Sequence, residues 1–362
     1  MLLKETESEK TAKRKLEHIE IVLTKPVEGP MTTWFEYVFL PQRALPVVDP
    51  ERVSVNVDFL GKEISAPLMI TGMTGGAPGT EVINRSLAEA ACKFKIALGL
   101  GSQRAALESR DLVYTYRVVR DVCTEVPIVG NLGISELIRY GPTVIHSLIS
   151  IVEVDAVAIH LNYFQEVVQP EGLAGLSQGL EVLSKTIEIS PVPIIVKEVG
   201  FGISKEFAAE LYSSGVRYVD VAGCGGTNWV LVELYRAMSL NNVVNQYIAD
   251  GIKDVGIPTA ASIVEVRSVS KDITIIGSGG IRSPYDAVKA IRLGANLVGL
   301  ARPVLVAYSK RQLNEFLEGF IVGMKSIIAS LGARNLDDVK RSPVVVVGLL
   351  RDWITSRGLQ LT

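Results

Sequence analysis

The sequence predicts an α/β fold in the form of a closed (β/α)8 barrel. Eight short apolar runs recur along the chain, each followed by glycine or polar residues and then by a helical pattern. Continuous apolar runs of this length are typical of parallel strands that are buried on both faces. Eight repeats of strand and helix indicate a barrel rather than an open doubly wound sheet. We expect the strands at 67–71, 96–100, 127–130, 155–160, 193–197, 217–222, 273–277 and 296–300.

Two segments lie outside this repeat. Residues 1–60 form an N-terminal extension, which is charged from Lys4 to His18, and residues 61–362 form the barrel. The connection after the sixth strand, residues 225–271, is much longer than an ordinary βα connection. It has helical apolar spacing in WVLVELYRAM and ASIVEVRSV. A long insertion at the catalytic end of a barrel is often a lid or a subunit contact, and we expect a homotetramer or a higher homo-oligomer.

Composition excludes several classes of protein. The chain is 48% hydrophobic and 21% charged, which is a globular balance. Its net charge of −2 provides no basic field for nucleic acid. No apolar run reaches the roughly 18 residues that span a membrane. Cys92, Cys123 and Cys224 show no paired spacing, so we expect no disulfide framework, no zinc site and a reducing, cytoplasmic location.

Two loops in the last third of the chain have the features of a phosphate cradle. GSGGIR (277–282) follows the seventh strand and GLARP (299–303) follows the eighth. Glycines let backbone N–H groups approach an anion, and a helix that begins near Ser283 adds positive potential. Either loop alone would fit a simple glycine-rich turn. Both together favour phosphate binding, because these are the phosphate-binding positions of the barrel.

Polar residues also follow the other strands. TGMTGG (71–76) leaves room for a flat ring, and Arg104 in GSQR (101–104) offers a fork of donors for an anionic oxygen. Lys197 ends an apolar strand, where its burial requires an anionic or polar neighbour. The simpler alternatives are a tight turn at 71–76, a surface ion pair for Arg104 and a pair between Lys197 and Glu198.

Two more clusters are candidates for binding an anionic substrate. HLNYFQE (160–166) brings polar side chains together at one strand end. In it, Glu166 suits Mg²⁺, which binds through one or two carboxylates plus substrate phosphates. RKLEH (14–18) is a basic cluster in which Arg14 and His18 would share a helix face. The alternatives are a hydrogen-bonded polar loop and a solvated helix face.

Taken in order, RKLEH, TGMTGG, GSQR, HLNYFQE, VKEVGFGIS (196–204), GSGGIR and GLARP resemble type 2 isopentenyl-diphosphate isomerase over nearly the whole chain. GSGGIR and GLARP are generic to flavin-binding barrels, whereas RKLEH, GSQR and HLNYFQE are more specific. The resemblance implies an FMN- and Mg²⁺-dependent enzyme that interconverts isopentenyl and dimethylallyl diphosphate. The flavin would be reduced, by NADPH or another reductant, without net redox change in the substrate.

The resemblance also implies roles for individual residues. The cofactor-binding set is Thr71, Gly72, Met73, Thr74, Ser102, Asn131, Lys197, Thr227, Gly279, Gly280, Arg282, Ala301 and Arg302. The substrate-binding set is Arg14, Lys15, His18, Ser102, Arg104, Asn162 and Gln165, and Glu166 is the metal ligand. Gln165, His160 and Lys197 are the catalytic candidates, with His160 at the diphosphate and Lys197 at the N1 side of the flavin ring.

Moving a double bond requires that one proton is delivered and another is removed. Gln165 is a neutral amide and a poor acid, so N5 of the reduced flavin is the expected proton carrier, with Gln165 or His160 as alternatives. The main rival function is a flavin-dependent 2-hydroxy-acid oxidase or dehydrogenase. Such an enzyme needs a strong base, usually a histidine with an arginine nearby, and none of the three histidines lies in the region expected for that base, ahead of the seventh strand. A non-catalytic barrel that serves as a binding module is the second rival.

Overall fold

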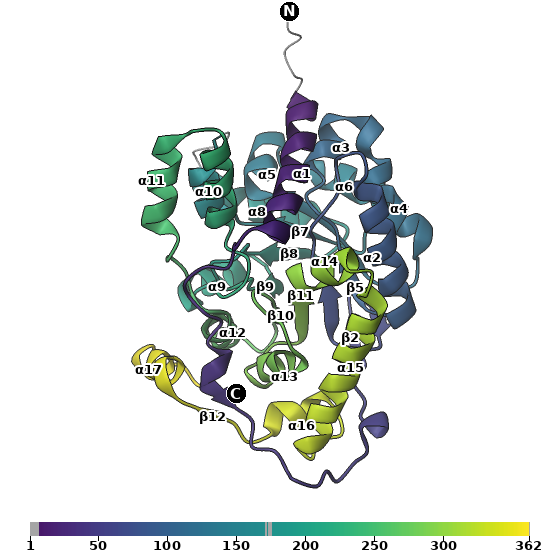
Figure 1. Ribbon diagram of the computed structural model, residues 1–362, viewed down its shortest axis with the longest axis vertical. Coiled ribbons are helices and arrows are strands. Elements are labelled where there is room, and N and C mark those ends of the chain that lie inside the picture. The colour runs from purple at the N-terminus through teal and green to yellow at the C-terminus, as the bar shows by residue number, and fades with distance from the viewer. Residues whose placement is uncertain (1–6, 171, 173–175, 362) are drawn as a thin grey trace, which may run out of the picture.

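The computed structural model describes residues 7–170, 172 and 176–361, so that Lys4, where the predicted charged stretch begins, lies outside them. The chain forms a closed barrel of parallel strands in the order β10-β11-β4-β5-β6-β7-β8-β9, which confirms the predicted fold (Figure 1). The barrel strands are β4 (Leu68–Ile70), β5 (Ala97–Gly99), β6 (Ile128–Gly133), β7 (Ala156–His160), β8 (Ile194–Lys197), β9 (Tyr218–Asp220), β10 (Thr274–Gly277) and β11 (Leu297–Leu300).

Each predicted strand is present, with small differences at the ends. Most observed strands are one or two residues shorter than predicted, but β6 continues to Gly133, because its last residues pair with β7 as far as His160. Apolar side chains from β4 to β11 pack in two layers, one inside the barrel and one between the strands and the surrounding helices. This double burial explains why the strands are continuous apolar runs in the sequence.

One helix packs outside the barrel after each strand. These helices are α2 (Thr80–Phe94), α4 (Tyr114–Val122), α6 (Val144–Val152), α8 (Gly179–Ile189), α9 (Lys205–Ser213), α12 (Thr259–Arg267), α13 (Pro284–Arg292) and α15 (Leu313–Ser330). Further helices follow the carboxyl ends of strands: α3 (Arg104–Glu108), α5 (Ile134–Tyr140), α7 (Tyr163–Val168), α10 (Trp229–Ser239), α11 (Val243–Ile252) and α14 (Arg302–Ser309). Among the described helices, none combines the length and the apolar character that a membrane crossing requires.

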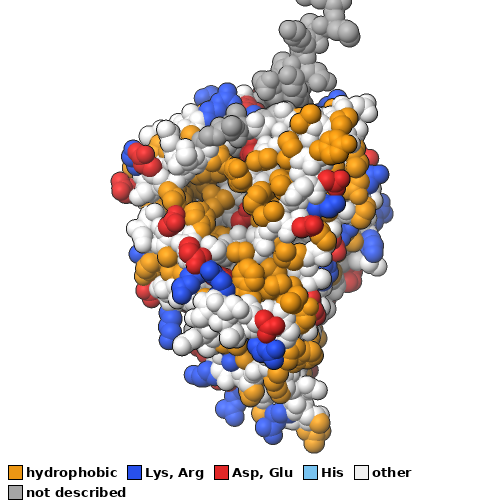
Figure 2. All heavy atoms as spheres, turned by 90° about the vertical axis from the view of Figure 1, so that its left-hand side faces the viewer, with side chains coloured by type: hydrophobic (Ala, Val, Ile, Leu, Met, Phe, Trp, Pro, Cys, Tyr) orange, Lys and Arg blue, Asp and Glu red, His pale blue; other side chains and the backbone are white. Residues whose placement is uncertain are grey.

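The long connection after β9 therefore contains α10, α11 and α12. The two predicted helical stretches are both helical. Every residue of α12 is buried, and α12 packs on α9 and β10 as a barrel helix does. In contrast, α10 and α11 pack on each other and on α7. Figure 2, which views the side of α11 and α17 (Gly348–Ser356), shows hydrophobic side chains gathered over the upper part of this face.

The segments before and after the barrel cover its two ends. Helix α1 (Glu7–Thr24) packs against α3, α10 and α14 at the carboxyl end of the strands (Figure 1). The hairpin of β2 (Val57–Phe59) and β3 (Lys62–Ile64) closes the other end, where Phe59 and Ile64 join the core inside the barrel. Near the C-terminus, α16 (Leu336–Arg341) is followed by β12 (Val345–Val346), which pairs with β1 (Val38–Phe39).

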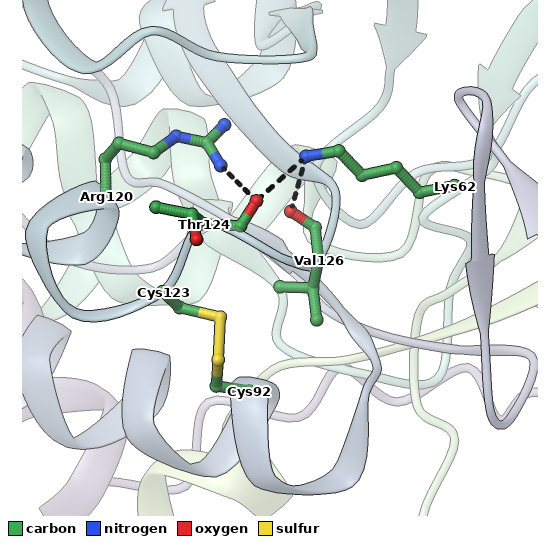
Figure 3. The surroundings of a disulfide bond; sticks show 6 residues. All are labelled: Lys62, Cys92, Arg120, Cys123, Thr124 and Val126. Atoms are coloured by element: carbon green, nitrogen blue, oxygen red, sulfur yellow. Dashed lines mark hydrogen bonds between the residues drawn. A yellow bond between two sulfur atoms is a disulfide. The ribbon is translucent and has the colours of Figure 1, made fainter.

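The prediction that the cysteines form no disulfide is wrong. Cys92 and Cys123 are joined by a disulfide that links the last turn of α2 to the residue after α4 (Figure 3). Their separation of 31 residues follows no motif, and the pairing exists because α2 and α4 pack side by side. Beside the disulfide, Lys62 and Arg120 both donate to the carbonyl of Thr124, each at 3.3 Å. Cysteine spacing therefore gives no support to a reducing location.

Candidate active site

A cavity of about 430 Å³ lies at the carboxyl ends of the barrel strands, beneath α1. This volume is within the range of cofactor and small-molecule sites. Every residue predicted for the site lines it, namely Arg14, Lys15, His18, Thr71, Gly72, Met73, Thr74, Ser102, Arg104, Asn131, His160, Asn162, Gln165, Glu166, Lys197, Thr227, Gly279, Gly280, Arg282, Ala301 and Arg302. Residues that sequence reasoning did not include, such as Glu28, Glu136 and Trp229, also line it.

The loop after β10 presents its backbone to the cavity. Gly279 and Gly280 have φ angles of +99° and +78°. A Cβ atom on either residue would collide with the backbone of the loop after β9, so only glycine fits at these positions. Ser283 then starts α13 with a capping box, in which its Oγ accepts from the N–H of Asp286 at 3.1 Å. The predicted helix start is confirmed.

Two arginines of the loops after β10 and β11 share one carboxylate. Glu28 Oε2 lies 2.9 Å from Arg282 Nη2, and Glu28 Oε1 lies 2.9 Å from Arg302 Nη1. Arg302 Nε also donates to the carbonyl of Val22 on α1 at 2.9 Å. The loops of GSGGIR and GLARP thus place two cations next to the exposed glycine backbone.

Lys197 meets an acid that sequence reasoning did not identify. The parallel register pairs Lys197 on β8 with Asp220 on β9, and Lys197 Nζ lies 3.4 Å from Asp220 Oδ2. The alternative pair with Glu198 does not form between side chains, because the Glu198 carboxylate accepts backbone N–H groups, including that of Phe201 at 2.6 Å. The feature of the sequence that could have identified Asp220 is an acidic residue within the apolar run RYVDVA.

His160 at the end of β7 is held in one orientation. Its Nδ1 donates to Oδ1 of Asn131 at 2.8 Å, and Asn131 Nδ2 donates to the carbonyl of Leu100 at 2.9 Å. Burial lowers the pKa of His160 to about 4, and the positive charges of Lys15 and Lys197 add to this effect against the opposing charge of Glu136. His160 is therefore a neutral hydrogen-bonding group at neutral pH.

Helix α1 directs basic side chains into the cavity. Lys15 Nζ donates to the carbonyl of Ser102 at 3.3 Å. Burial, together with the charge of Arg14, lowers the pKa of Lys15 to about 8. His18 lies with its Nε2 2.9 Å from Oε1 of Glu233 and its ring edge-on to Trp229. The basic cluster is thus not a solvated helix face.

Glu233 on α10 connects three elements around the cavity. Its buried carboxylate contacts His18 of α1, accepts from Gln165 Nε2 of α7 at 3.1 Å and pairs with Arg236 at 2.7 Å. Burial acts to raise the pKa of Glu233, but His18 and Arg236 outweigh it and hold the pKa at about 2. The signal in the sequence was a pair of opposite charges three residues apart inside the apolar stretch WVLVELYR.

Arg104 has two carboxylate partners rather than a surface ion pair. Its Nε lies 2.7 Å from Glu108 Oε1 and its Nη1 lies 3.0 Å from Glu136 Oε1, and all three side chains are less than one-fifth exposed. These two acids fix the plane of the guanidinium group at the rim of the cavity.

Glu166 and Asn162 form a small oxygen-rich site. Asn162 Nδ2 donates to Glu166 Oε1 at 2.7 Å, which turns Asn162 Oδ1 away from that carboxylate. Asn162 Oδ1 is buried and has no hydrogen-bond partner within the described part of the chain. The described residues contain no group of three His, Cys, Asp or Glu side chains that could hold a metal. A cation here would need further ligands from a substrate.

Comparison with known proteins assigns the chain to a family. Residues 174–346 match the family of FMN-dependent dehydrogenases. Two solved structures of mandelate oxidase, one with a monooxide FMN adduct and one with (S)-2-phenylpropionate, superpose with TM-scores of 0.62 and 0.62. They cover 94% and 92% of this chain and 100% and 98% of their own chains. At 15% identity they show a common fold only.

Much closer relatives are named isopentenyl-diphosphate delta-isomerase. The relative from Methanothermobacter thermautotrophicus is 44% identical over 350 residues, which are 96% of this chain and 97% of the relative. The relative from Sulfurisphaera tokodaii is 43% identical over 358 residues, which are 96% and 95% of the two chains. Identity at this level over almost the full length includes both the barrel and the N-terminal extension. The chain therefore belongs to the isopentenyl-diphosphate delta-isomerase family.

Proposed function

We propose that this protein interconverts isopentenyl diphosphate and dimethylallyl diphosphate with the help of FMN and Mg²⁺. The observation that carries the proposal is that one cavity contains two separate groups of cations. Arg282 and Arg302 lie on the barrel loops after β10 and β11, whereas Arg14, Lys15 and Arg104 lie on α1 and α3. A flavin phosphate and a substrate diphosphate each need such a group. In this division, residues 1–60 contribute to the substrate site and the barrel of 61–362 carries the cofactor.

The residues present fit FMN. The glycines after β10 leave backbone exposed beside two arginines, and Gly72 after β4 has no room for a Cβ atom against the Leu100 carbonyl. Thr71, Met73, Asn131 and Thr227 provide the surrounding wall. Reduced FMN, when bound, supplies an electron-rich ring and a nitrogen that exchanges protons. Lys197 would stabilise the negative charge of that ring, and Asp220 holds Lys197 in place.

The buried oxygens of Glu166 and Asn162 fit Mg²⁺, with the remaining ligands coming from the diphosphate and water. A cation held there would neutralise the diphosphate and limit its departure from an allylic product. Because Nδ1 of His160 already donates its proton to Asn131, His160 would donate from Nε2 to a diphosphate oxygen only as an imidazolium, a form that the negative charge of the diphosphate favours. Gln165 would face the isoprene carbons, where its amide orients the substrate without acting as a strong acid.

A 2-hydroxy-acid oxidase is the second candidate, because the superposed structures of mandelate oxidase have the same barrel fold as this chain. The chain lacks the base that this chemistry requires. Its histidines are His18, His146 and His160. His146 is exposed on α6 and does not line the cavity. Burial lowers the pKa of His18, and it lowers that of His160 to about 4, so both are weak bases.

NADPH as reductant, a cytoplasmic location and a homotetramer remain predictions. The last has support from α11, whose Val243, Val244 and Tyr247 are 56%, 67% and 77% exposed. An apolar face of this kind is typical of subunit contacts.

The test is an assay of the purified protein with isopentenyl diphosphate, FMN, Mg²⁺ and a reductant. We expect dimethylallyl diphosphate as the product, and no oxidation of lactate or mandelate when an electron acceptor replaces the reductant. Oxidation of a 2-hydroxy acid without isomerase activity would replace the proposal with the second candidate. A protein that binds no FMN and has neither activity would indicate a binding module.

A further inference from the structure

The carboxylate of Glu28 occupies a position that an anionic ligand of the two loops would also seek. Glu28 lines the cavity and contacts Arg282 and Arg302 at 2.9 Å each, although the two arginines come from separate loops. The backbone around Glu28 is anchored. Glu28 forms a β-bridge with Thr227, and the N–H of Asn228 donates to the Val27 carbonyl at 2.8 Å. The position of this carboxylate is thus built into the segment that follows α1.

Glu28 differs from the other carboxylates that pair with cavity cations. Its side chain is 43% exposed, whereas those of Glu136 and Glu233 are 8% and 0% exposed. An exposed ion pair contributes little to stability, so this carboxylate can turn into water at small cost. Buried carboxylates lack this freedom, because separation would leave an uncompensated charge inside the protein.

A phosphate monoester competes well for the same arginines. It carries between one and two negative charges at neutral pH and three oxygens, against one charge and two oxygens for Glu28. Each arginine offers a planar fork of donors that fits either group. Both cannot hold the two arginines at once without gathering excess negative charge in the loops.

We propose that Glu28 is a displaceable counter-ion of the phosphate site, which holds Arg282 and Arg302 in the free protein and yields them to the FMN phosphate. The inference rests on the proposed function, since it assumes that FMN binds in this cavity. Glu28 follows α1, and Arg302 also donates to Val22 of α1. Replacement of Glu28 by the phosphate would therefore affect the contacts of the helix that carries Lys15 and His18. Cofactor binding and the placement of α1 are then coupled.

The test measures dissociation constants of the apoprotein for FMN and for riboflavin, by titration of flavin fluorescence. Riboflavin has the same ring but no phosphate. In Glu28→Gln we expect the Kd for FMN to fall about tenfold, because the competing charge is removed, and the Kd for riboflavin to stay unchanged. The matched control is Glu20→Gln, which removes the same charge from an exposed position on α1 and should change neither constant.

An unchanged or raised Kd for FMN in Glu28→Gln would overturn the inference, because Glu28 would then be irrelevant or would help to orient the arginines. Equal changes for FMN and riboflavin would also overturn it, since the effect would lie in the shape of the cavity. If the wild-type protein binds neither flavin, the proposed function fails together with the inference. If it binds FMN and only the variant disagrees, the proposed function stands.

Discussion

The two groups of cations in the cavity are built in different ways. The loops after β10 and β11 rely on short contiguous motifs, on glycine backbone and on two partly exposed arginines. The other group is assembled from distant segments: His18 and Glu233 are 215 residues apart, and Arg236 and Glu17 are 219 apart. The first kind of site tolerates exchange of partners, whereas the second depends on a fixed buried network. Substitutions in the buried network should therefore cost more.

The largest expected effect is that of Glu166→Gln. The substitution keeps the shape of the side chain but removes the charge proposed to hold Mg²⁺ beside Asn162. We expect turnover to fall about 100-fold or more while FMN remains bound, as its absorbance spectrum will show. A normal rate at saturating Mg²⁺ would remove Glu166 from the metal site.

Glu233→Gln tests the buried network. The variant loses the ion pair with Arg236 and weakens the hydrogen-bond acceptor for His18 and Gln165. We expect kcat to fall roughly tenfold to 100-fold with an unchanged Kd for FMN, since truncating a buried ion pair typically costs a few kcal/mol. Glu233 acts here as a positioning residue. Loss of FMN affinity in parallel with activity would instead show that the substitution disturbs the whole cavity.

Lys15 should make substrate binding by the cations of α1 and α3 depend on pH. Because burial lowers the pKa of Lys15 to about 8, its positive charge is lost as the pH rises through this value. We expect the KM for the diphosphate substrate to rise about tenfold between pH 7 and pH 9. Lys15→Arg should flatten this profile, because arginine stays charged, whereas Lys13→Arg at an exposed position of α1 should keep it. The same slope in Lys15→Arg would assign the titration to another group.

The smallest effect on activity is expected from the disulfide, which lies outside both cation groups. Cys92 and Cys123 do not line the cavity. Reduction, or the double substitution of both residues by serine, should lower stability by about 2–4 kcal/mol and leave kcat within about twofold. Thermal unfolding with and without dithiothreitol measures this, and dithiothreitol should not affect the double variant. A large loss of activity on reduction would mean that the α2–α4 contact controls the cavity.

The contrast between contiguous motifs and contacts of distant segments also explains which features could be predicted from the sequence. The eight barrel strands were predictable because strands buried on both faces are continuous apolar runs. The glycine loop after β10 was predictable because Gly279 and Gly280 stand next to each other in one motif. Their φ angles of +99° and +78° lie in the region that favours glycine. The pairs β1–β12 and β2–β3 were not found, since strands of two or three residues carry no periodic signal.

Pairings between distant segments were beyond the same reasoning. Lys197 required an anionic neighbour, yet only the register of β8 and β9 identifies Asp220 as that neighbour. Glu233 was one charge within an apolar helix, and its three partners come from α1, α7 and α10. Cys92 and Cys123 became a disulfide only through the packing of α2 on α4. In each case the side chain was visible in the sequence and its partner was not.

The proposed function requires that this cavity isomerises a diphosphate ester with a reduced flavin and without net redox change. The most direct measurement is the number of dimethylallyl diphosphate molecules formed per molecule of NADPH consumed, in the absence of oxygen and with FMN and Mg²⁺ present. We expect almost no product with oxidised FMN, and after reduction many product molecules for each NADPH. One NADPH consumed per product, or equal rates with oxidised and reduced FMN, would contradict the proposed function.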